Sequence, residues 1–271
     1  MKVFVFDSAK CNGCYTCQIA CKDEHVDNDW SPYAKPQPET GHFWLKLHET
    51  DHGQVPKVRV EYRPVTCMHC EKPSCIEASD GAVYKRDDGL VIIDPEKAQG
   101  ARGLVDSCPY GAIYWNETLN IPQKCTGCAH LVDEGMIPHC VDLCPTGAWR
   151  FGEKEEFAQE IAQAELLKPE AGSGPNVYYL NLPKLFISGE VWDPEDDDII
   201  CGANVTLTNV DSGDSWVEQS DEFGDFWFKR LDSGTYSLGI KAEGFKEFSR
   251  TDIKLDKSLN VGDFPLERRQ Q

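Results

Sequence analysis

The chain has 271 residues, 13 of them cysteine, and a formal net charge of −19 at pH 7. This acidity argues against binding to nucleic acid or to an anionic membrane surface, because both carry negative charge themselves. No stretch has the roughly 18 consecutive apolar residues of a membrane helix, so direct membrane insertion is not expected. The first residues lack the pattern of a signal peptide, which predicts a cytoplasmic chain; export with a signal-bearing partner is the alternative.

The first cysteine run follows a short strand predicted for residues 2–7, which are rich in Val and Phe. The run reads CNGCYTCQIAC, with three cysteines at a spacing of three and a fourth after a spacing of four. In ferredoxin runs of this form, the first three thiolates hold one [4Fe–4S] cluster and the fourth ligates another. The run therefore needs a partner run elsewhere in the chain. Its cysteines are Cys11, Cys14, Cys17 and Cys21.

Loops and hairpins are predicted for the stretch that follows. Residues 22–38 are polar and rich in proline, which predicts an irregular covering loop. Two hairpins are expected, the first around an Asp-His-Gly turn at 51–53 and the second around an Asp-Asp-Gly turn at 87–89. Their strands are residues 43–47 with 58–65, and residues 81–85 with 90–93.

A second cysteine run lies between these hairpins. It supplies Cys67, Cys70 and Cys75, and Ser79 stands where a fourth cysteine would continue the pattern. A lone Cys108 follows, and the proline after it is typical of a cluster cysteine in bacterial ferredoxins.

The third run again ends in a Cys-Pro pair. It consists of Cys125 and Cys128, then eleven other residues, then Cys140 and Cys144. Its ends match those of the first run, and the long middle gap requires only a loop between two ligands. A helix is expected over residues 155–167 because its apolar residues recur with a helical period.

The pattern changes from about residue 184 onward. Short strand-like stretches recur at intervals of about ten residues, separated by Gly, Asp and Ser, as in an all-β sandwich. We therefore expect two domains, an iron–sulfur domain over 1–183 and a sandwich over 184–271. The predicted strands of the sandwich are 186–191, 203–208, 226–229 and 236–241.

All cysteines except Cys201 lie before residue 145, and four ligands for each cluster give three clusters. The ferredoxin pattern, in which the first and last runs exchange their fourth ligands, assigns the members. One cluster takes Cys11, Cys14, Cys17 and Cys144. Another takes Cys21, Cys125, Cys128 and Cys140. The remaining cysteines form one complete third set, namely Cys67, Cys70, Cys75 and Cys108.

Other interpretations of the cysteines are less consistent with their spacing. Zinc also uses CxxC pairs, but three ligands within seven residues plus a distant Cys-Pro fit a zinc ribbon poorly. A disulfide framework would require a secreted chain. Three histidines near cluster cysteines, His69, His130 and His139, are expected to lie around the clusters or at the surface, because twelve thiolates complete three sites.

Several charged or isolated residues have two interpretations. Lysines beside the cysteine runs either raise the reduction potentials or are simply solvated; they are Lys10, Lys22, Lys72 and Lys124. The acidic stretch 193–198 is interpreted as a solvated turn in preference to a calcium site. Cys201 is expected to be a small buried residue. No P-loop, GxSxG or HExxH motif is present, so the chain is expected to have no active site of its own.

With these motifs in place, residues 1 to about 183 resemble the four-cluster iron–sulfur subunits of the dimethyl-sulfoxide-reductase family of molybdopterin enzymes. Those subunits fuse two ferredoxin-like modules, so the resemblance implies an inner module at about 60–115 between the paired runs 11–21 and 125–144. The chain departs from the family at the ligands of one cluster, which should be replaced by packed side chains. The positions concerned are Ser79, Ala98, Ala101 and Leu104.

The C-terminal part resembles the carboxypeptidase-regulatory-like or Cna-B-like sandwich, which is immunoglobulin-like. The matching stretches are ISGEV at 187–191, GANVTL at 202–207, GDF at 224–226, GTY at 234–236 and AEGF at 242–245. The expected fold class is therefore α+β, with two fused bacterial-ferredoxin-like modules followed by an all-β sandwich. A deleted cluster combined with such a sandwich is similar to the small subunit of an anaerobic transhydroxylase within the family.

The resemblance implies a non-catalytic electron-transfer subunit with three [4Fe–4S] clusters. Its partner in a heterodimer would be a large catalytic subunit, and only that partner would bind molybdopterin. One alternative is the electron-transfer subunit of a quinone-linked molybdenum reductase or dehydrogenase, for example one that acts on sulfur oxyanions. A zinc-stabilised interaction protein is the other.

Overall fold

The computed structural model describes residues 1–269, which divide into two compact units. The first unit comprises residues 1–49 and 62–182. The second comprises residues 50–61 and the chain from residue 183 onward. The second unit thus includes, besides the C-terminal segment, the outer part of a hairpin that lies within the expected iron–sulfur domain.

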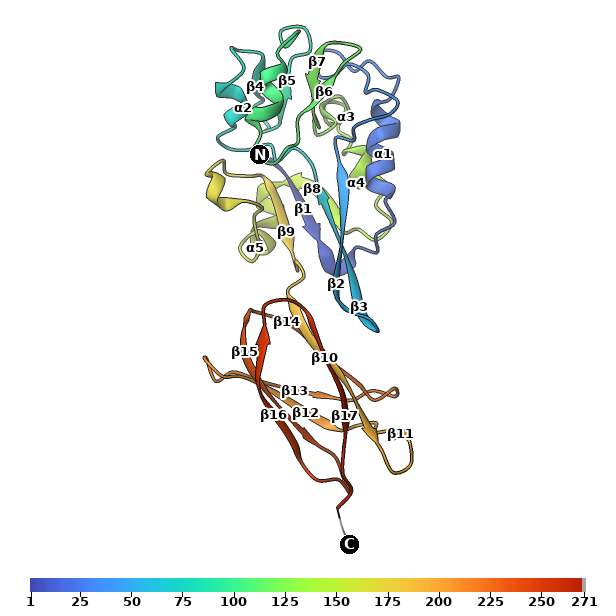
Figure 1. Ribbon diagram of the computed structural model, residues 1–271. Helices are drawn as coiled ribbons and strands as arrows, with labels where there is room; N and C mark the ends of the chain where they lie inside the picture. Colours follow the sequence, from blue (N-terminus) through green and yellow to red (C-terminus); the bar gives the residue numbers. More distant parts are fainter. Residues whose placement is uncertain (270–271) are drawn as a thin grey trace. The chain divides into compact units, whose positions relative to one another are not determined.

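A three-stranded sheet forms the centre of the first unit (Figure 1). Strand β1 (Lys2–Asp7) lies between β8 (Trp149–Glu153), to which it is antiparallel, and β9 (Val177–Leu180), to which it is parallel. Alternate residues of a strand point to opposite faces. Phe4 and Phe6 accordingly pack with several cysteines in one core cluster, while Val3 and Val5 pack with Tyr178 in another. The predicted strand at 2–7 is confirmed.

The helices of the first unit are short, and most contain or adjoin cysteines. Helix α1 (Thr16–His25) carries Cys17 and Cys21 and was not predicted from the sequence. The others are α2 (Ser74–Glu77), α3 (Ala129–Asp133), α4 (His139–Asp142) and α5 (Ala158–Ile161). Short 3₁₀ turns are Ser8–Lys10, Arg102–Ser107, Lys154–Phe157 and Pro169–Ala171.

The helix predicted for 155–167 is much shorter in the structure. It consists of the 3₁₀ turn Lys154–Phe157 followed by α5. The chain leaves the helix because Glu165 pairs with Tyr179 of β9 through two backbone hydrogen bonds of 2.8 and 3.0 Å. Tertiary pairing therefore overrides the local helical period.

Three two-stranded hairpins add to the first unit, and one of them also extends into the second. They are β2 (Lys46–Gln54) with β3 (Lys57–Val65), β4 (Val83–Lys85) with β5 (Val91–Ile93), and β6 (Tyr114–Asn116) with β7 (Ile121–Gln123). The hairpin around Asp-Asp-Gly is confirmed. The turn predicted at 51–53 is wrong, because β2 continues to Gln54 and the chain turns at Val55 and Pro56.

The outer part of the β2–β3 hairpin packs within the second unit. Gly53 has a positive φ of 97°, and a Cβ there would lie 2.5 Å from the Phe186 ring. Lys57 forms an ion pair with Asp225. A glycine at position 53 is therefore required both by the backbone conformation and by the close approach of the aromatic ring.

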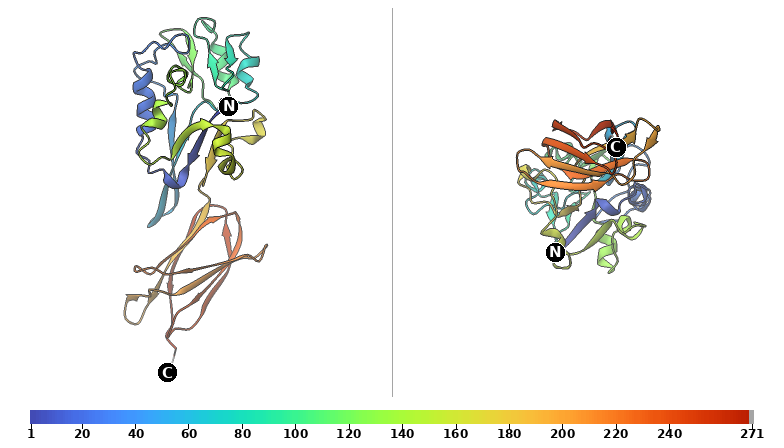
Figure 2. Two further views of the ribbon diagram at one scale, coloured as in Figure 1. Left: turned by 180° about the vertical axis from the view of Figure 1, so that it is seen from behind. Right: turned by 90° about the horizontal axis from the view of Figure 1, so that it is seen from below.

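Two sheets make up the sandwich of the second unit (Figure 2). In one sheet β10 (Leu185–Asp193) pairs with β11 (Asp198–Ile199), β14 (Asp225–Leu231) and β17 (Leu259–Pro265). In the other the order is β13 (Ser215–Gln219), β12 (Asn204–Asn209), β15 (Gly234–Lys241) and β16 (Phe248–Leu255). All buried members of the core between the sheets come from residues 187–266.

The four strands predicted for the sandwich are all present, and four further strands were missed. Among the missed strands, β13 is exposed throughout and so lacks an apolar face that a pattern could reveal. The prediction that Cys201 is buried is wrong. Cys201 lies in the turn before β12, where Gly202 has a φ of 76° and Ala203 is buried in the core.

Candidate metal centres

The Cys67 site is a cavity in the first unit that is lined by four cysteines. Cys67 and Cys70 follow β3, Cys75 lies in α2, and Cys108 follows a 3₁₀ turn. The cavity encloses about 340 Å³ free of protein atoms, including space open to solvent. Most of the other lining side chains are apolar or aromatic, among them Met68, Val91, Tyr110 and Ile113. The structure thus brings together one complete predicted ligand set.

The Cys11 site is a second cavity, also about 340 Å³, that contains another complete predicted set. Its cysteines are Cys11, Cys14, Cys17 and Cys144. Cys14 is exposed and the other three are partly buried, so this site lies near the surface. Phe6, Leu47 and Trp149 contribute apolar walls. Gly13 permits the close approach of the Tyr62 ring to the backbone, because its φ is 71° and a Cβ there would lie 2.3 Å from that ring.

The Cys21 site consists of the remaining four cysteines, all of them buried: Cys21, Cys125, Cys128 and Cys140. They lie close enough to influence one another, since Cys21 interacts electrostatically with Cys125 and Cys128, and Cys140 with all three others. Two hydrogen bonds of 3.3 Å are donated to sulfur, from the Gly127 amide to Cys125 and from the Trp149 indole to Cys140. Such donors stabilise negative charge on the sulfur atoms.

Burial raises the pKa of several of these cysteines. Desolvation raises the pKa of Cys17 to about 12 and that of Cys70 to about 11, and it raises the pKa of Cys21 and Cys140 well above the ordinary value. These thiols lose their protons when a metal compensates the charge of the thiolate, and metal binding therefore releases protons. Four sulfur donors around an apolar cavity fit a [4Fe–4S] cluster, which supplies one-electron transfer.

Glu24 connects the elements that carry the cysteines of the Cys21 site. It lies on α1, three residues after Cys21. Its carboxylate accepts hydrogen bonds from His130 of α3 at 2.9 Å and from His139 of α4 at 2.6 Å. Cys128 caps the start of α3 and Cys140 lies in α4, so the carboxylate connects all three helices that carry or adjoin these cysteines.

His25 lies beside this network in a buried position. Burial lowers the pKa of His25 to about 3, so its imidazole is neutral at physiological pH. The centre of the ring lies 4.6 Å from that of Trp44, and its Nε2 is 3.7 Å from the sulfur of Cys128.

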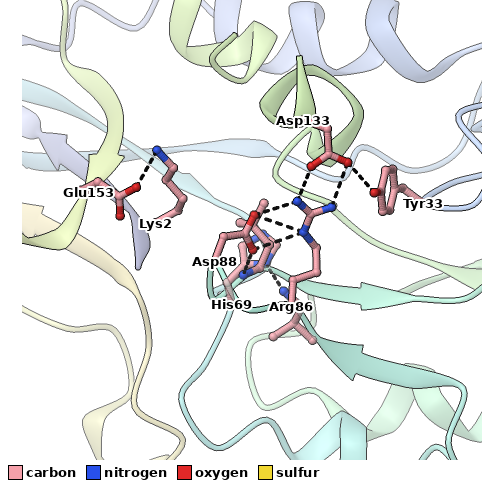
Figure 3. Close-up of polar contacts among 9 residues, drawn as sticks. Lys2, Tyr33, His69, Arg86, Asp88, Asp133 and Glu153 are labelled. Carbon is pink, nitrogen blue, oxygen red and sulfur yellow. Dashed lines mark hydrogen bonds and ion pairs between the residues drawn. The ribbon is translucent and has the colours of Figure 1, made fainter. Parts of the chain in front are cut away.

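Arg86 forms a second connection, shown in Figure 3. Its guanidinium lies between the carboxylates of Asp88 and Asp133, at 2.9 and 2.5 Å. Tyr33 donates a hydrogen bond to the same Asp133 carboxylate. The β4–β5 hairpin is thereby tied to the end of α3, close in sequence to Cys128. Sequence patterns pointed to neither Glu24 nor Arg86, because charged residues in polar stretches are usually solvated.

We expect Glu24→Ala to weaken retention of an iron–sulfur cluster bound at the Cys21 site. The change removes two hydrogen bonds to a carboxylate, each worth roughly 1.5–3 kcal/mol. When the variant is heated under anaerobic conditions, the cluster absorbance should be lost at a lower temperature than in the unmodified protein. Asp23→Ala is the matched control, since Asp23 is an exposed acidic neighbour on the same helix. Equal bleaching temperatures for the two variants would contradict this role of Glu24.

Most of the positions at which packed side chains are expected in place of cluster ligands are buried. Ala98 is fully buried, and Leu104 and Ser79 are 2% and 6% exposed. Ala98 and Leu104 pack in one core cluster with Val83, Ile93 and others. The Ser79 hydroxyl is engaged by the backbone, since it donates to the Ile76 carbonyl and accepts from the Val83 amide.

An arginine from the C-terminal end of the sandwich pairs with the acidic stretch 193–198. Arg268 forms ion pairs with Asp193, Glu195 and Asp196. The guanidinium supplies the positive charge that a calcium ion would otherwise provide, which favours the interpretation of this stretch as an ordinary turn.

Two family models match the chain. Residues 58–154 match the model described as a 4Fe-4S dicluster domain, and residues 187–267 match the carboxypeptidase regulatory-like domain. None of the helices between residues 1 and 269 combines the length and hydropathy of a membrane-spanning segment.

The chain is similar to subunits of one hydroxytransferase and of several reductases. It is 40% identical to the pyrogallol hydroxytransferase small subunit of Pelobacter acidigallici, over 95% of this chain and 96% of that protein. It is 34% identical to one chain of the anaerobic dimethyl sulfoxide reductase of Escherichia coli (strain K12), over 64% of this chain and 88% of that one. One subunit of the tetrathionate reductase of Salmonella typhimurium is 29% identical, over 68% and 74% respectively.

Proposed function

Because the chain belongs to the family of iron–sulfur electron-transfer subunits of molybdopterin enzymes, we propose that it carries three [4Fe–4S] clusters for a large catalytic subunit. The main support is that each predicted set of four cysteines lies together, two of the sets around cavities of similar volume. The twelve cysteines are the proposed ligands. Molybdopterin belongs to the partner alone, and this chain contributes no catalytic residue.

The proposed reaction of the complex is hydroxyl transfer between pyrogallol and phloroglucinol. The similarity to the pyrogallol hydroxytransferase small subunit extends over 95% of the chain and so includes the sandwich. The similarity to the dimethyl sulfoxide reductase chain covers only 64%. Hydroxyl transfer between two phenols involves no net oxidation. Electrons from this chain would therefore set the oxidation state of the partner's metal, without a steady current through the clusters.

Within this function, the residues of the chain bind the clusters and exclude water. The Cys11 site is lined by the apolar side chains of Phe6, Leu47 and Trp149. The Cys67 site is lined in the same way by Met68, Val91 and Ile113. Apolar walls keep the local dielectric low and so increase the influence of nearby fixed charges on each cluster.

A quinone-linked reductase or dehydrogenase of sulfur oxyanions is the second candidate. It is favoured by the 29% identity to the tetrathionate reductase subunit. The packed core at Ala98 and Leu104 argues against it, because the absence of one cluster would lengthen an electron path along the chain.

The test is anaerobic purification of the chain with its large subunit, followed by metal analysis and assays on trihydroxybenzenes. We expect about twelve irons for each copy of this chain, four for each cluster, molybdenum in the large subunit, and pyrogallol-dependent hydroxyl transfer. About sixteen irons, or zinc in place of iron, would refute the cluster assignment. Twelve irons with reduction of tetrathionate and no hydroxyl transfer would establish the second candidate.

A further inference from the structure

Lys124 is a buried cation beside the candidate metal centres. It is 3% exposed, although lysine is almost never fully buried unless it is paired. Its ammonium donates hydrogen bonds to two backbone carbonyls, those of Val91 and Cys125. Among residues 1–269, no carboxylate forms an ion pair with it. A buried ammonium without a carboxylate partner is costly, so its presence requires another compensating negative charge.

Cysteines from two different sites are able to carry that charge. Lys124 lines the cavity of the Cys67 site. It interacts electrostatically with Cys67 and Cys75 of that site and also with Cys125 of the Cys21 site. Lys124 is absent from the lining of the Cys11 cavity. The cation therefore lies beside two of the three proposed cluster positions.

The other lysines beside the cysteine runs are placed differently. Lys10 and Lys72 are exposed, so water screens their charge. Lys22 is partly exposed and donates to the carbonyls of Pro38 and His42, at 2.7 and 2.8 Å. Lys85 reaches the Cys70 carbonyl, but Glu71 neutralises it at 2.9 Å. Among these cations, Lys124 alone combines full burial with an electrostatic interaction at two sites.

We propose that Lys124 sets the reduction potentials of the clusters at the Cys67 and Cys21 sites, by stabilising the added electron in both. This inference rests on the proposed three-cluster function. A cluster held by four thiolates is anionic, and reduction makes it more negative by one charge. A fixed positive charge in a water-excluded position stabilises the reduced form more than the oxidised form, which raises the potential.

Redox titration of the anaerobic complex, monitored by electron paramagnetic resonance, tests the proposal. Lys124→Met removes the charge, Lys124→Gln removes it while keeping a hydrogen-bond donor, and Lys124→Arg keeps it. Lys72→Met is the matched control, because it removes an exposed positive charge between two cysteines of the Cys67 site.

In the two neutral variants we expect two of the three clusters to become harder to reduce. The reduction equilibrium should change by about tenfold or more, which is about 59 mV for a one-electron couple. The third cluster should keep its potential, Lys124→Arg should restore the other two, and Lys72→Met should shift none by that amount.

Unchanged potentials in neutral variants that retain their iron would overturn the proposal. So would an equal shift of all three clusters. Loss of iron from both neutral variants, with full iron in Lys124→Arg, would also overturn it, because the lysine would then act by holding the Val91 and Cys125 backbone. Fewer than three clusters in the unmodified complex would instead refute the proposed function, which separates the two failures.

Discussion

In the Cys108→Ser variant we expect damage to the cluster of the Cys67 site, and in Cys144→Ser damage to the cluster of the Cys11 site. Each change removes one of the four cysteines around a different cavity. A serine oxygen is a poor substitute for a thiolate, so each variant should lose up to about four irons or show an altered cluster signal. Iron analysis and low-temperature spectra of the anaerobically purified complex measure the outcome.

The double variant provides a sharper test of the pairing. If the two cysteines serve different clusters, the iron losses should add, because changes at independent sites are additive. If both served one cluster, the double variant would lose no more iron than either single variant. That result, or loss of the same spectral signal in both single variants, would contradict the assignment.

The chain also contains its own control for these substitutions. Cys201 is the one cysteine outside the proposed sets, and it is exposed in the sandwich. Cys201→Ser should therefore leave the iron content and all cluster spectra unchanged. A loss of iron in this variant would show that substitution of cysteine affects the clusters by a route other than ligation.

The cysteines that lie close together within each proposed set could be recognised because ligand spacing is a property of the chain itself. A cubane requires four thiolates, and a short spacing such as that from Cys11 to Cys17 can be satisfied only locally. Strand β1 was predictable for a similar reason, since the successive residues Val3 to Phe6 are all apolar and buried. Strand β1 and the closely spaced cysteines of each set depend on residues that are close together in sequence, whereas the distant fourth members, such as Cys144 beside Cys11, were assigned from the ferredoxin pattern.

The supporting contacts could not be predicted in this way. Glu24 meets His130 and His139 only after more than a hundred residues of chain have folded back. Lys124 and Lys10 each precede a cysteine that starts a run. Lys124 is nevertheless buried, whereas Lys10 is exposed. Burial of a polar side chain depends on which distant elements cover it, and the local sequence does not carry that information.

The helical period over 155–167 failed for the same kind of reason. Its apolar residues do pack inward, since Phe157, Ile161 and Ala164 all contact the cluster around Val3 and Tyr178. Glu165 nevertheless pairs with β9, and this long-range strand contact ends the helix early.

The last expected result concerns the sandwich. Expressed alone from about residue 184, it should fold, because every buried residue of its core lies between 187 and 266. Its denaturation should be a single cooperative transition by circular dichroism and tryptophan fluorescence. A chain without cooperative unfolding would mean that the predicted domain boundary is misplaced.

The complementary experiment truncates the chain after Pro183. All twelve proposed ligands precede this position, so the truncated chain should retain about twelve irons. Residues 50–61, however, lose their contacts, because they group with the second unit through Phe186 and Asp225. We therefore expect the β2–β3 hairpin to become less stable while the cluster spectra persist.

Truncation after Pro183 should weaken binding to the large subunit more than it affects the clusters. If the sandwich serves as a contact surface, its removal should weaken co-purification by about tenfold or more, the effect of roughly 1.4 kcal/mol of interface free energy. Full-length Lys57→Met is the matched comparison, since it removes only the ion pair with Asp225 and leaves the sandwich in place. Loss of iron from the truncated chain with the large subunit still bound would mean that the sandwich completes the surroundings of a cluster, and the division into two domains would then be wrong.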